Sequence, residues 1–550
     1  MKSNPFSTVP YKFALLPLAI GLLSGCLSSD NNDSGSNNDN SIDQAPVAVG
    51  EPVTLSLDTS TVRNTVSERF LSVAFDMAQQ VPEIDFWDDA GVIDLKRQAL
   101  LNMAKQFSPG YLRIGGTDAD KTFYQVGAQK MTEKPEHFEG TLTENQTDEL
   151  FAFANSAGLD VILGLNAGPG TRNQDGTWNS TNSDSLMDYV DSKQYKVAAW
   201  ELGNEPGLMP NFHSNFEVPP TQLADDHVQF SNALADSPVL FIGPDDAFAP
   251  VVGNVSLTTD AVNNLDAYFP SAFLDAMAPG SHIRTSGYLK DYLAALPENT
   301  LDAISWHYYP QQSVRCPLSL PATSADLLLA PENLNDIKKW IAEIEGYRDL
   351  YQSNAEIWLA ETGNAQCGGQ VGISDRFASS FWWLDELGVL AQHDNDVAIR
   401  QTLAGSEYGL IDNVTLQPRS DYWASVLWKK NMGHKVLTVS QEADDNLRVY
   451  AHCHPTEQDT LSLLAINLDA TKAFAVDTQA WTGKETHQYV MTADQLDSAT
   501  IKINGQEMSV DAQGEFEIPM KKFIATDAID VEPRSMAFFQ IKGAGAAACQ

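Results

Sequence analysis

The pattern of apolar and polar positions changes once along the chain, which divides it into two regions. From about residue 68 to 403, short apolar runs alternate with longer amphipathic stretches that predict helices, as at 94–107 and 333–352. The apolar runs predict eight strands, at 69–76, 110–116, 160–168, 196–206, 239–246, 303–310, 356–363 and 396–403. Near-continuous apolar strands separated by helices are typical of a parallel sheet, and eight repeats predict a (β/α)8 TIM barrel.

After about residue 425 the pattern changes to short strand-like segments, which predict a β-sandwich. These segments lie at 434–441, 447–454, 461–468, 516–520 and 536–543. The stretch 51–60 also alternates apolar and polar residues, so we expect it to join the sandwich. The expected fold is α/β, a TIM barrel with a β-sandwich domain formed by the C-terminal region plus an N-terminal strand. The expected parts are the N-terminal strand at 49–65, the barrel at 66–424 and the C-terminal sandwich at 425–550.

The first residues have the pattern of an export signal. Lys2 and Lys12 precede the apolar stretch FALLPLAIGLL. This stretch is too short to span a bilayer and fits the core of a signal peptide. The stretch ends in LSGC, which resembles a bacterial lipobox and implies cleavage before Cys26 and acylation of that cysteine. A plain secretory signal is the alternative. We expect a signal peptide at 1–25 and a disordered tether at 26–48, because the polar sequence there cannot form a core.

The lipobox resemblance also predicts a location. Leu27, rather than an aspartate, follows the cysteine, and by the same resemblance this favours the outer membrane. We therefore expect a protein of the bacterial cell envelope that is lipid-anchored to the outer membrane. Its contact with the membrane is expected only through that anchor.

The charge of the chain limits its partners. The sequence has 34 basic and 73 acidic residues, a net charge of −39. Such a surface repels polyanions, so a nucleic-acid partner is excluded and a densely sulfated substrate is disfavoured. No metal or other cofactor is expected, and we expect a monomer.

Four cysteines follow Cys26 along the chain. An even number in an exported protein permits two disulfides, with three possible connectivities. These cysteines are Cys316, Cys367, Cys453 and Cys549.

Polar residues that close the predicted strands are the candidates for chemistry, because active sites of TIM barrels lie at the carboxyl ends of the strands. Two of them are glutamates in similar settings, Glu205 after the fourth strand and Glu361 after the seventh. A pair of carboxylates suits glycosidic bond cleavage, in which one protonates the leaving oxygen and the other attacks the anomeric carbon. A single glutamate there is more simply a structural ion-pair partner, but two in equivalent places favour the catalytic interpretation.

Several motifs resemble those of a known family. WELGNEP and IWLAETG resemble the signature of retaining glycosidases of clan A. YLRIGGTDAD, WHYYP, IRQTLAGSEYGLID and LRVYAHC resemble glycoside hydrolase family 79, the family of heparanase and bacterial β-glucuronidases. The resemblance covers roughly residues 50 to 550, in the same order along the chain. It implies the same barrel and sandwich, including a sandwich strand from the N-terminal side.

The resemblance also implies roles for individual residues. Glu205 matches the general acid/base, Glu361 the nucleophile, and Asn204 an asparagine that hydrogen-bonds the sugar 2-hydroxyl. The other matches are substrate-binding positions: Asp76 and Thr117 for sugar hydroxyls, His307 and Tyr309 for lining the site and orienting the nucleophile, and Gln401 and Tyr408 for the uronate carboxylate. Asp118 and Asp120 are interpreted as solvated loop acids without a catalytic role.

The resemblance further implies a disulfide between Cys453 and Cys549 in the sandwich. A second bridge, Cys316–Cys367, is reasonable because both cysteines follow barrel strands whose loops share one face. Glu407 departs from the family pattern: relatives have a small residue beside Tyr408, whose N–H helps to bind the uronate. A carboxylate that pointed inward there would repel a uronate.

The expected function is that of a retaining glycoside hydrolase acting on an oligo- or polysaccharide. Its most specific form is a β-glucuronidase that removes β-linked glucuronic acid by double displacement. The alternatives are an endo-acting heparanase-like hydrolase, an exo-β-glycosidase for a neutral sugar, and a non-catalytic glycan-binding lipoprotein. Two consequences can be checked: the carboxyl groups of Glu205 and Glu361 should lie about 5–5.5 Å apart, and the pKa of Glu205 should be raised.

Overall fold

A computed structural model describes residues 43–44, 48–84, 91–214, 216–235, 237–248, 288–316, 323–441 and 445–550. The predicted signal peptide, Cys26 and most of the predicted tether lie outside these ranges. Two tether residues form strand β1 (Asp43–Gln44), which pairs with β22 (Lys521–Ile524). Within the described ranges no helix has the length and apolarity to cross a membrane.

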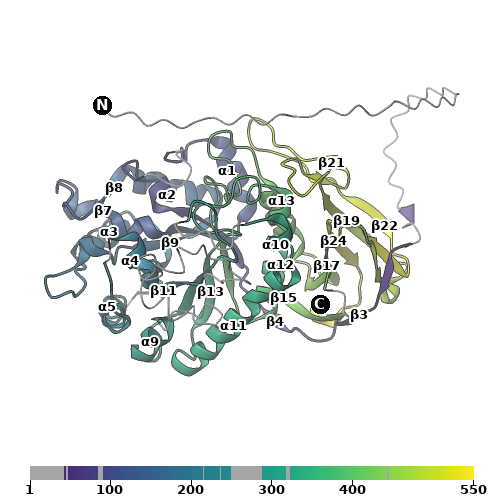
Figure 1. Cartoon of the computed structure of the whole chain (residues 1–550), viewed down its shortest axis with the longest axis horizontal. Helices are drawn as coiled ribbons and strands as arrows, with labels where there is room; N and C mark the ends of the chain where they lie inside the picture. The colour runs from purple at the N-terminus through teal and green to yellow at the C-terminus, as the bar shows by residue number, and fades with distance from the viewer. Residues whose placement is uncertain are drawn as a thin grey trace, which may run out of the picture. The chain divides into compact units, whose positions relative to one another are not determined.

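All eight predicted barrel strands are confirmed. They pair side by side in parallel and close on themselves, in an order that follows the chain (Figure 1). The strands are β5 (Leu71–Asp76), β6 (Gly110–Gly115), β9 (Leu159–Leu165), β10 (Val197–Leu202), β11 (Leu240–Phe248), β12 (Ala303–Tyr308), β13 (Glu356–Thr362) and β14 (Val397–Arg400). Every catalytic candidate therefore meets the others at one end of one closed sheet.

Helices cover the outside of the barrel, as the amphipathic stretches predict. They are α1 (Gln98–Ala104), α2 (Glu144–Ala157), α3 (Thr181–Ser192), α5 (Pro220–Ala233), α9 (Tyr288–Ala295), α11 (Pro331–Tyr351), α12 (Phe377–Gln392) and α13 (Ser420–Asn431). Local sequence sets their limits. In α2, Thr143 and Gln146 form a capping box at the start, and Gly158 ends the helix in the left-handed conformation. Helix α13 crosses position 424, where the sequence pattern divides the two regions.

The sandwich is built from both ends of the chain, so the predicted fold class is confirmed. Its larger sheet has the path β1-β22-β19-β24-β17-β16-β15-β3, and a smaller sheet has the order β2-β18-β23. The predicted N-terminal strand is divided into β2 (Glu51–Val53) and β3 (Leu55–Asp58), one in each sheet. The remaining strands of these two paths are β15 (Lys435–Gln441), β16 (Leu447–Cys453), β17 (Thr460–Asn467), β18 (Phe474–Asp477), β19 (Glu485–Thr492), β23 (Ala528–Val531) and β24 (Ser535–Lys542); β4 (Asn64–Thr65), β20 (Lys502–Ile503) and β21 (Gln506–Glu507) pair beside the larger path.

One predicted sandwich strand is wrong. Residues 516–520 form no strand. Phe516 packs edge-on against Trp423 of α13, with ring centroids 4.9 Å apart, and Pro519 has no N–H to donate to a ladder. The segment's apolar residues therefore reflect packing against the barrel, not strand pairing.

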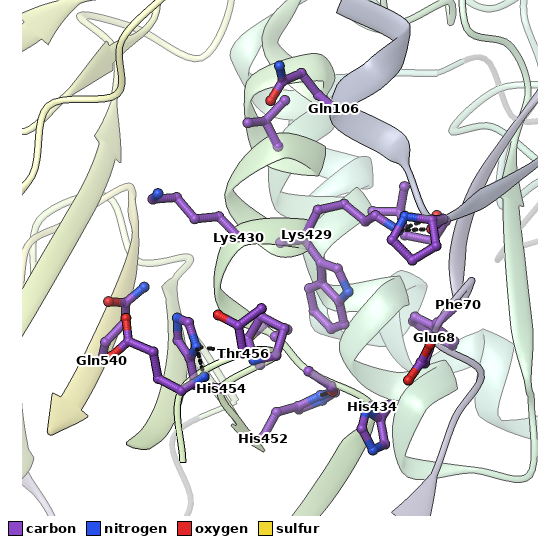
Figure 2. Close-up of a pocket in the computed structure, with 18 of the residues that line it drawn as sticks. Glu68, Phe70, Gln106, Lys429, Lys430, His434, His452, His454, Thr456 and Gln540 are labelled. Atoms are coloured by element: carbon purple, nitrogen blue, oxygen red, sulfur yellow. Dashed lines mark hydrogen bonds between the residues drawn. The ribbon is translucent and has the colours of Figure 1, made fainter. Parts of the chain in front are cut away.

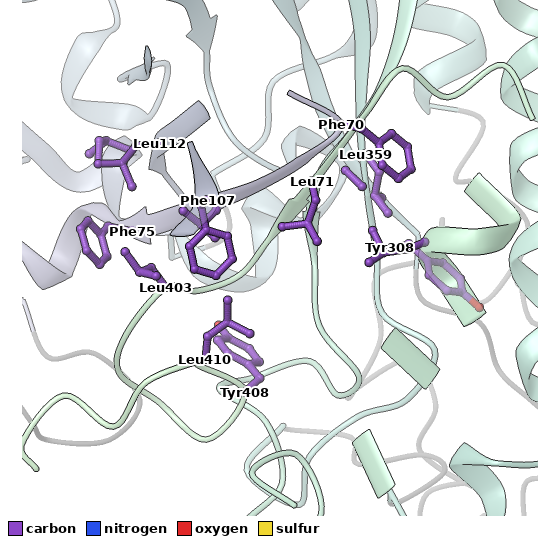
Figure 3. Close-up of a cluster of buried hydrophobic side chains, with 14 of the residues drawn as sticks. Phe70, Leu71, Phe75, Phe107, Leu112, Tyr308, Leu359, Leu403, Tyr408 and Leu410 are labelled. Atoms are coloured by element: carbon purple, nitrogen blue, oxygen red, sulfur yellow. The ribbon is translucent and has the colours of Figure 1, made fainter. Parts of the chain in front are cut away.

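The hydrophobic core extends from the barrel strands into the loop that follows β14. Figure 3 shows Leu403, Tyr408 and Leu410 of this loop in the same buried cluster as Phe75 and Phe107. The loop is thus anchored by core packing, and this fixes the position of Tyr408, which the sequence assigns to substrate binding.

Both expected disulfides are present. Cys316–Cys367 joins the segments that follow β12 and β13, with Cα atoms 5.4 Å apart. Cys453–Cys549 joins the end of β16 to the short helix Ala547–Cys549, with Cα atoms 5.2 Å apart. One bridge therefore lies at the carboxyl end of the barrel and the other lies in the sandwich.

Candidate active site

A buried arginine organises the carboxyl end of the barrel. Arg113 of β6 is 1% exposed, and its Nε lies 2.8 Å from Glu201 Oε2. Its Nη1 donates to Glu361 Oε2 at 2.9 Å, and its Nη2 donates to Asn204 Oδ1 at 3.0 Å and to Asp245 Oδ2 at 3.1 Å. Three carboxylates thus compensate one buried cation. Sequence reasoning missed Arg113; the available signal was a charged residue inside an apolar strand.

Backbone geometry brings Glu205 into this network. The residue follows β10 with φ of +44°, in the left-handed region, and its N–H donates to the carbonyl of Asp245 at 3.0 Å. Pro206 then begins a short helix. A left-handed non-glycine residue is uncommon and costs about 1 kcal/mol or more, so the surrounding contacts must hold Glu205 in place. Its side chain is buried, as is that of Glu361 on β13.

The two glutamates lie close together. A carboxylate oxygen of Glu205, a ring nitrogen of His307 and a carboxylate oxygen of Glu361 all lie within 4.8 Å of one another. Burial raises the pKa of Glu205, a hydrogen bond from His307 opposes the rise, and the charge of Glu361 adds to it. The net direction is upward, as the sequence predicts, so Glu205 holds its proton to a higher pH than an exposed glutamate does.

His307 connects both glutamates with Asp245. Its Nδ1 lies 3.2 Å from Glu205 Oε1 and 4.0 Å from Glu361 Oε2, and its Nε2 lies 3.6 Å from Asp245 Oδ1. Burial alone would lower the pKa of His307, but Glu361, Asp245 and Glu205 raise it to about 10. The ring is therefore an imidazolium at neutral pH. Burial opposes ionisation of Asp245, but Arg113 and His307 hold its pKa well below the usual value.

Tyr309 fixes the second oxygen of Glu361. Its hydroxyl donates to Glu361 Oε1 at 2.5 Å, while Arg113 occupies Oε2. Burial raises the pKa of Tyr309 well above 10, so the phenol keeps the proton that it donates. Both oxygens of Glu361 are thus held in a single orientation.

Asn204 presents an unused donor. Its Oδ1 accepts from Arg113, but its buried Nδ2 has no hydrogen-bond partner among the described residues. Asp120 holds its backbone, accepting from the N–H of Asn204 at 2.9 Å and from that of Ala167 at 2.7 Å. The interpretation of Asp120 as a solvated loop acid was wrong: it is 1% exposed, and burial raises its pKa to about 7. It positions Asn204 instead.

Asp76 ends β5 on the same face. Its Oδ1 accepts from the N–H of Ala78 at 3.0 Å. Burial first, then Asp118, and more weakly Glu361, raise the pKa of Asp76 well above its usual value. Asp118 is 9% exposed and pairs with Lys121 at 2.7 Å, so it is not a solvated acid either.

Thr117 begins the short helix Thr117–Lys121 and is half-buried. No side-chain hydrogen bond joins it to the network within the described part of the chain. Gly116 precedes it with φ of +85°, and a Cβ there would lie 2.1 Å from Asp76 Oδ2. Only glycine allows the Asp76 carboxylate to lie against this turn.

Gln401 and Tyr408 belong to the segment after β14 and are both buried. Burial, Glu361 and Asp76 raise the pKa of Tyr408 well above 10, and a hydrogen bond with Gln401 opposes them. The ring centroid of Tyr408 lies 6.2 Å from that of Tyr309. Gln401 Oε1 has no partner among the described residues. The structure thus brings Tyr408 near Glu361 and Asp76, with Gln401 as its hydrogen-bond partner.

Glu407 is engaged in an ion pair. Its Oε1 lies 2.8 Å from Nη2 of Arg315, a residue that sequence reasoning did not identify. Its N–H donates to the carbonyl of Gly368 at 2.8 Å, beside the Cys316–Cys367 bridge. The carboxylate that departs from the family pattern is therefore neutralised by a neighbouring loop.

Comparison with known proteins identifies the family. The model of the glycosyl hydrolase family 79 N-terminal domain matches residues 53–237 and 264–388. Heparanase of Bos taurus is 32% identical over 426 residues, which cover 74% of this chain and 70% of the bovine protein. The chain belongs to glycoside hydrolase family 79.

The similar proteins include one that is named as inactive. The human protein named inactive heparanase-2 is 26% identical over 583 residues, covering 91% of this chain and 90% of its own. Among solved structures, the family 51 arabinofuranosidase of Xanthomonas axonopodis pv. citri superposes with a TM-score of 0.61 at 13% identity, over 89% of this chain and 100% of that one. That likeness concerns the fold. The family and the fold together make this protein a glycoside hydrolase.

A metal ion does not suit this site. Among the described residues, one cluster, Glu205, His307 and Glu361, brings three potential ligands close enough together. Arg113 donates to Glu361, and His307 carries a positive charge at neutral pH. Both charges oppose a bound cation.

Proposed function

We propose that this glycoside hydrolase is a retaining, exo-acting β-glucuronidase. The observation that carries the proposal is the proximity of the two glutamates: one carboxylate oxygen of Glu205 and one of Glu361 lie within 4.8 Å of each other. Retaining enzymes hold their carboxyl groups about 5–5.5 Å apart, whereas inverting enzymes leave about 6.5–9.5 Å for a water molecule. The short separation supports direct attack by one of the two glutamates.

The proposed reaction has two displacements. Glu205 gives its proton to the leaving glycosidic oxygen while a Glu361 oxygen bonds to the anomeric carbon, which releases the aglycone as an alcohol. The deprotonated Glu205 then takes a proton from water, whose oxygen displaces Glu361 from the same carbon. Two inversions leave the configuration unchanged. Glu361 is suited to attack because Arg113 and Tyr309 orient it, and Glu205 because its pKa is raised.

Asn204 supports this assignment. Its free Nδ2 suits a hydrogen bond to the sugar 2-hydroxyl, an interaction that strengthens as positive charge develops on the ring. Asp76 and Thr117 are proposed to bind further sugar hydroxyls.

A uronate is the proposed glycone. Tyr408 and Gln401 lie beside the carboxylates with a phenol and an amide that suit a carboxylate group. The one objection, repulsion by Glu407, is weakened by its ion pair with Arg315. The bovine relative carries the name heparanase, and this is compatible with glucuronide cleavage.

The test measures hydrolysis of a matched panel of aryl β-glucuronide, β-glucoside, β-galactoside and β-xyloside, with the first-released anomer followed by proton NMR. The expected result is fastest cleavage of the glucuronide, with the β-anomer appearing first. Appearance of the α-anomer first would overturn the retaining mechanism, and preference for a neutral glycoside would overturn the uronate assignment. Cleavage of polysaccharide into internal fragments without release of monosaccharide would replace exo by endo action.

We also propose that Cys26 is acylated and anchors the protein to the outer membrane. The lipobox-like LSGC and the polar sequence after it support this. Mass spectrometry of the protein from membranes is expected to find a lipid on Cys26, and Cys26→Ser is expected to release the protein into the soluble fraction. An unmodified cysteine in the processed protein would refute the anchor.

A further inference from the structure

A cavity of about 910 Å³ lies at the opposite end of the barrel from the two glutamates. Its wall includes Phe70 and Leu71, at the start of β5, and Ser108 and Pro109, just before β6. These are the amino ends of strands whose carboxyl ends carry the active site. Other parts of the wall come from α13 and from β16 and the residues that follow it, as Figure 2 shows for Lys429, Lys430, His452 and His454.

Two lysines of α13 line this cavity: Lys429 is half-buried and Lys430 is exposed, and neither has a carboxylate partner among the described residues. Lys429 Nζ donates to the carbonyls of Pro109 and Leu71, at 2.5 and 3.5 Å. Lys430 lies over the ring of Tyr489, 5.8 Å from its centroid. Burial, with the charge of Arg69, lowers the pKa of Lys429 to about 8. A cation that is desolvated and left without an anion is a site where a bound anion gains free energy.

The acids of the wall do not fill this role. Glu457 pairs with Lys542, and Glu68 is exposed. No ion pair of the described residues includes Lys429 or Lys430. In a chain of net charge −39, the wall carries as many lysines as glutamates, two of each.

Two histidines add hydrogen-bonding groups of the opposite kind. His452 is 1% exposed; its Nδ1 lies 2.6 Å from the carbonyl of Gly433, so Nδ1 carries the proton and Nε2 is an acceptor. That Nε2 has no partner among the described residues. His454 Nδ1 accepts from the N–H groups of Thr456 and Glu457, which leaves its Nε2 to donate. Burial lowers the pKa of both rings to about 4, so both are neutral.

From these groups we infer that the cavity between the amino end of the barrel and the sandwich is a second, non-catalytic binding site for an unsulfated oligosaccharide that carries carboxylates. Lys429 and Lys430, which point to opposite sides of α13 in Figure 2, would each pair with a different carboxylate of the ligand, and the free acceptor of His452 suits a hydroxyl donor. A sulfate ion offers no such donor at neutral pH. The volume is in the range of about 300–1,000 Å³ that encloses a ligand of several rings.

The choice of a saccharide as the hydroxyl-bearing anion rests on the proposed function. Such a site would hold the enzyme on a polymeric substrate while the active site acts elsewhere on the chain, because two linked sites raise the effective concentration of substrate. A densely sulfated saccharide is disfavoured because the long-range repulsion from the acidic surface grows with ligand charge.

The test uses isothermal titration calorimetry with the full chain carrying Glu361→Ala, so that the probe is not consumed. The probe is an unsulfated hexasaccharide of alternating glucuronic acid and N-acetylglucosamine. Cellohexaose, a heparin hexasaccharide and inorganic phosphate are the comparison ligands. The test variant adds Lys429→Met and Lys430→Met. The matched control adds Lys338→Met and Lys339→Met, two lysines that are adjacent in sequence on α11.

We expect two classes of binding sites for the unsulfated hexasaccharide. The affinity of one class should fall by about tenfold or more in the test variant and not in the control, because this is the loss expected for one charged hydrogen bond. His452→Phe and Lys430→Met alone should weaken the same class, which keeps the test valid if Lys429→Met impairs folding. A single class unaffected by these changes would overturn the site. Equal or tighter binding of phosphate, heparin hexasaccharide or cellohexaose at this class would overturn the ligand assignment.

The same lysine changes in the chain with Glu361 intact should leave kcat/KM on an aryl β-glucuronide unchanged. If that aryl substrate is not cleaved at all but the hexasaccharide still binds at the lysines, the proposed function fails and the second site stands.

Discussion

Positive charge is compensated in different ways at the two ends of the barrel. At the carboxyl end, Arg113 contacts the carboxylates of Glu201, Asp245 and Glu361. At the amino end, Lys429 donates hydrogen bonds to backbone carbonyls and has no carboxylate partner among the described residues. The first arrangement is a closed network whose charges orient one another. The second leaves a charge to be matched from outside. The two sites differ in how their charges are paired. At the proposed catalytic site the cation has carboxylate partners within the protein, whereas at the proposed second site the partner would be the ligand.

The sandwich provides a third, contrasting solution. Its interior is apolar, with a cluster that includes Leu437, Leu463 and Phe539, and it is closed by the Cys453–Cys549 bridge. It supplies none of the charged groups described at the carboxyl end. We interpret the sandwich as contributing stability, and the barrel interior as giving up stability to hold charged groups where the reaction needs them.

Arg113→Met should have the largest effect, because it leaves three carboxylates facing one another without their cation. Breaking a buried ion network in this way costs about 3–5 kcal/mol, and Glu361 would also lose its orientation. Urea unfolding and aryl-glycoside kinetics should both show the loss. Lys430→Met at the other end is the control, expected to change unfolding by no more than about 0.5 kcal/mol. If the Arg113→Met protein were as stable as the unchanged protein, the proposed role of Arg113 in compensating the three carboxylates would be wrong.

Glu205→Ala should act on rate and not on folding. General acid catalysis contributes about 10²–10⁴-fold, so substrates with poor leaving groups should slow by that factor. Activated aryl substrates need little protonation and should slow far less, and azide should partly restore turnover. The measurement compares kcat/KM for a series of aryl glycosides of different leaving-group pKa. Equal losses across the series would refute the acid/base role.

Removing the sandwich bridge should act on folding and not on rate. Cys453→Ser with Cys549→Ser is expected to cost about 2–4 kcal/mol of unfolding free energy, because the bridge constrains a long loop of the unfolded chain. The bridge joins residues 96 positions apart. Thermal melting should detect the change while kcat/KM at moderate temperature stays the same. A fall in kcat/KM before any unfolding would show that the sandwich influences the site.

The pH profile should report the state of Glu205. The reaction needs its proton, and the pKa is raised above 4.5 by burial and by Glu361, so activity is retained above pH 4.5 and is lost as pH rises through the raised pKa. With an activated aryl substrate, Glu205→Gln should remove this alkaline limb. Persistence of the limb in that variant would assign it to another group.

Glu407→Gly should have the smallest effect. Because Arg315 already neutralises Glu407, we expect glucuronide hydrolysis to be unchanged or modestly higher. The measurement compares matched aryl glucuronide and glucoside substrates. Loss of activity on the glucuronide alone would mean that the ion pair itself supports uronate binding.

The fold was predictable because its signal is local. The barrel strands are near-continuous apolar runs closed by polar residues, and each of the eight predicted runs overlaps a barrel strand. The segment 516–520 shows the limit of this signal, since apolar residues that pack on α13 look like residues of a strand. The active-site candidates were found for the same local reason: Glu205 and Glu361 end their strands within recognisable motifs.

What the sequence determined by itself was the set of elements and which residues close the strands, because periodicity and motifs act over a few positions. Only the tertiary structure decided which charges meet. Arg113 and Glu361 are 248 positions apart, and Arg315 and Glu407 are 92 apart. Such contacts depend on closing the barrel and folding its loops onto one another, and no local pattern records them. The same holds for the lysine-lined cavity, whose wall exists only once barrel and sandwich have come together.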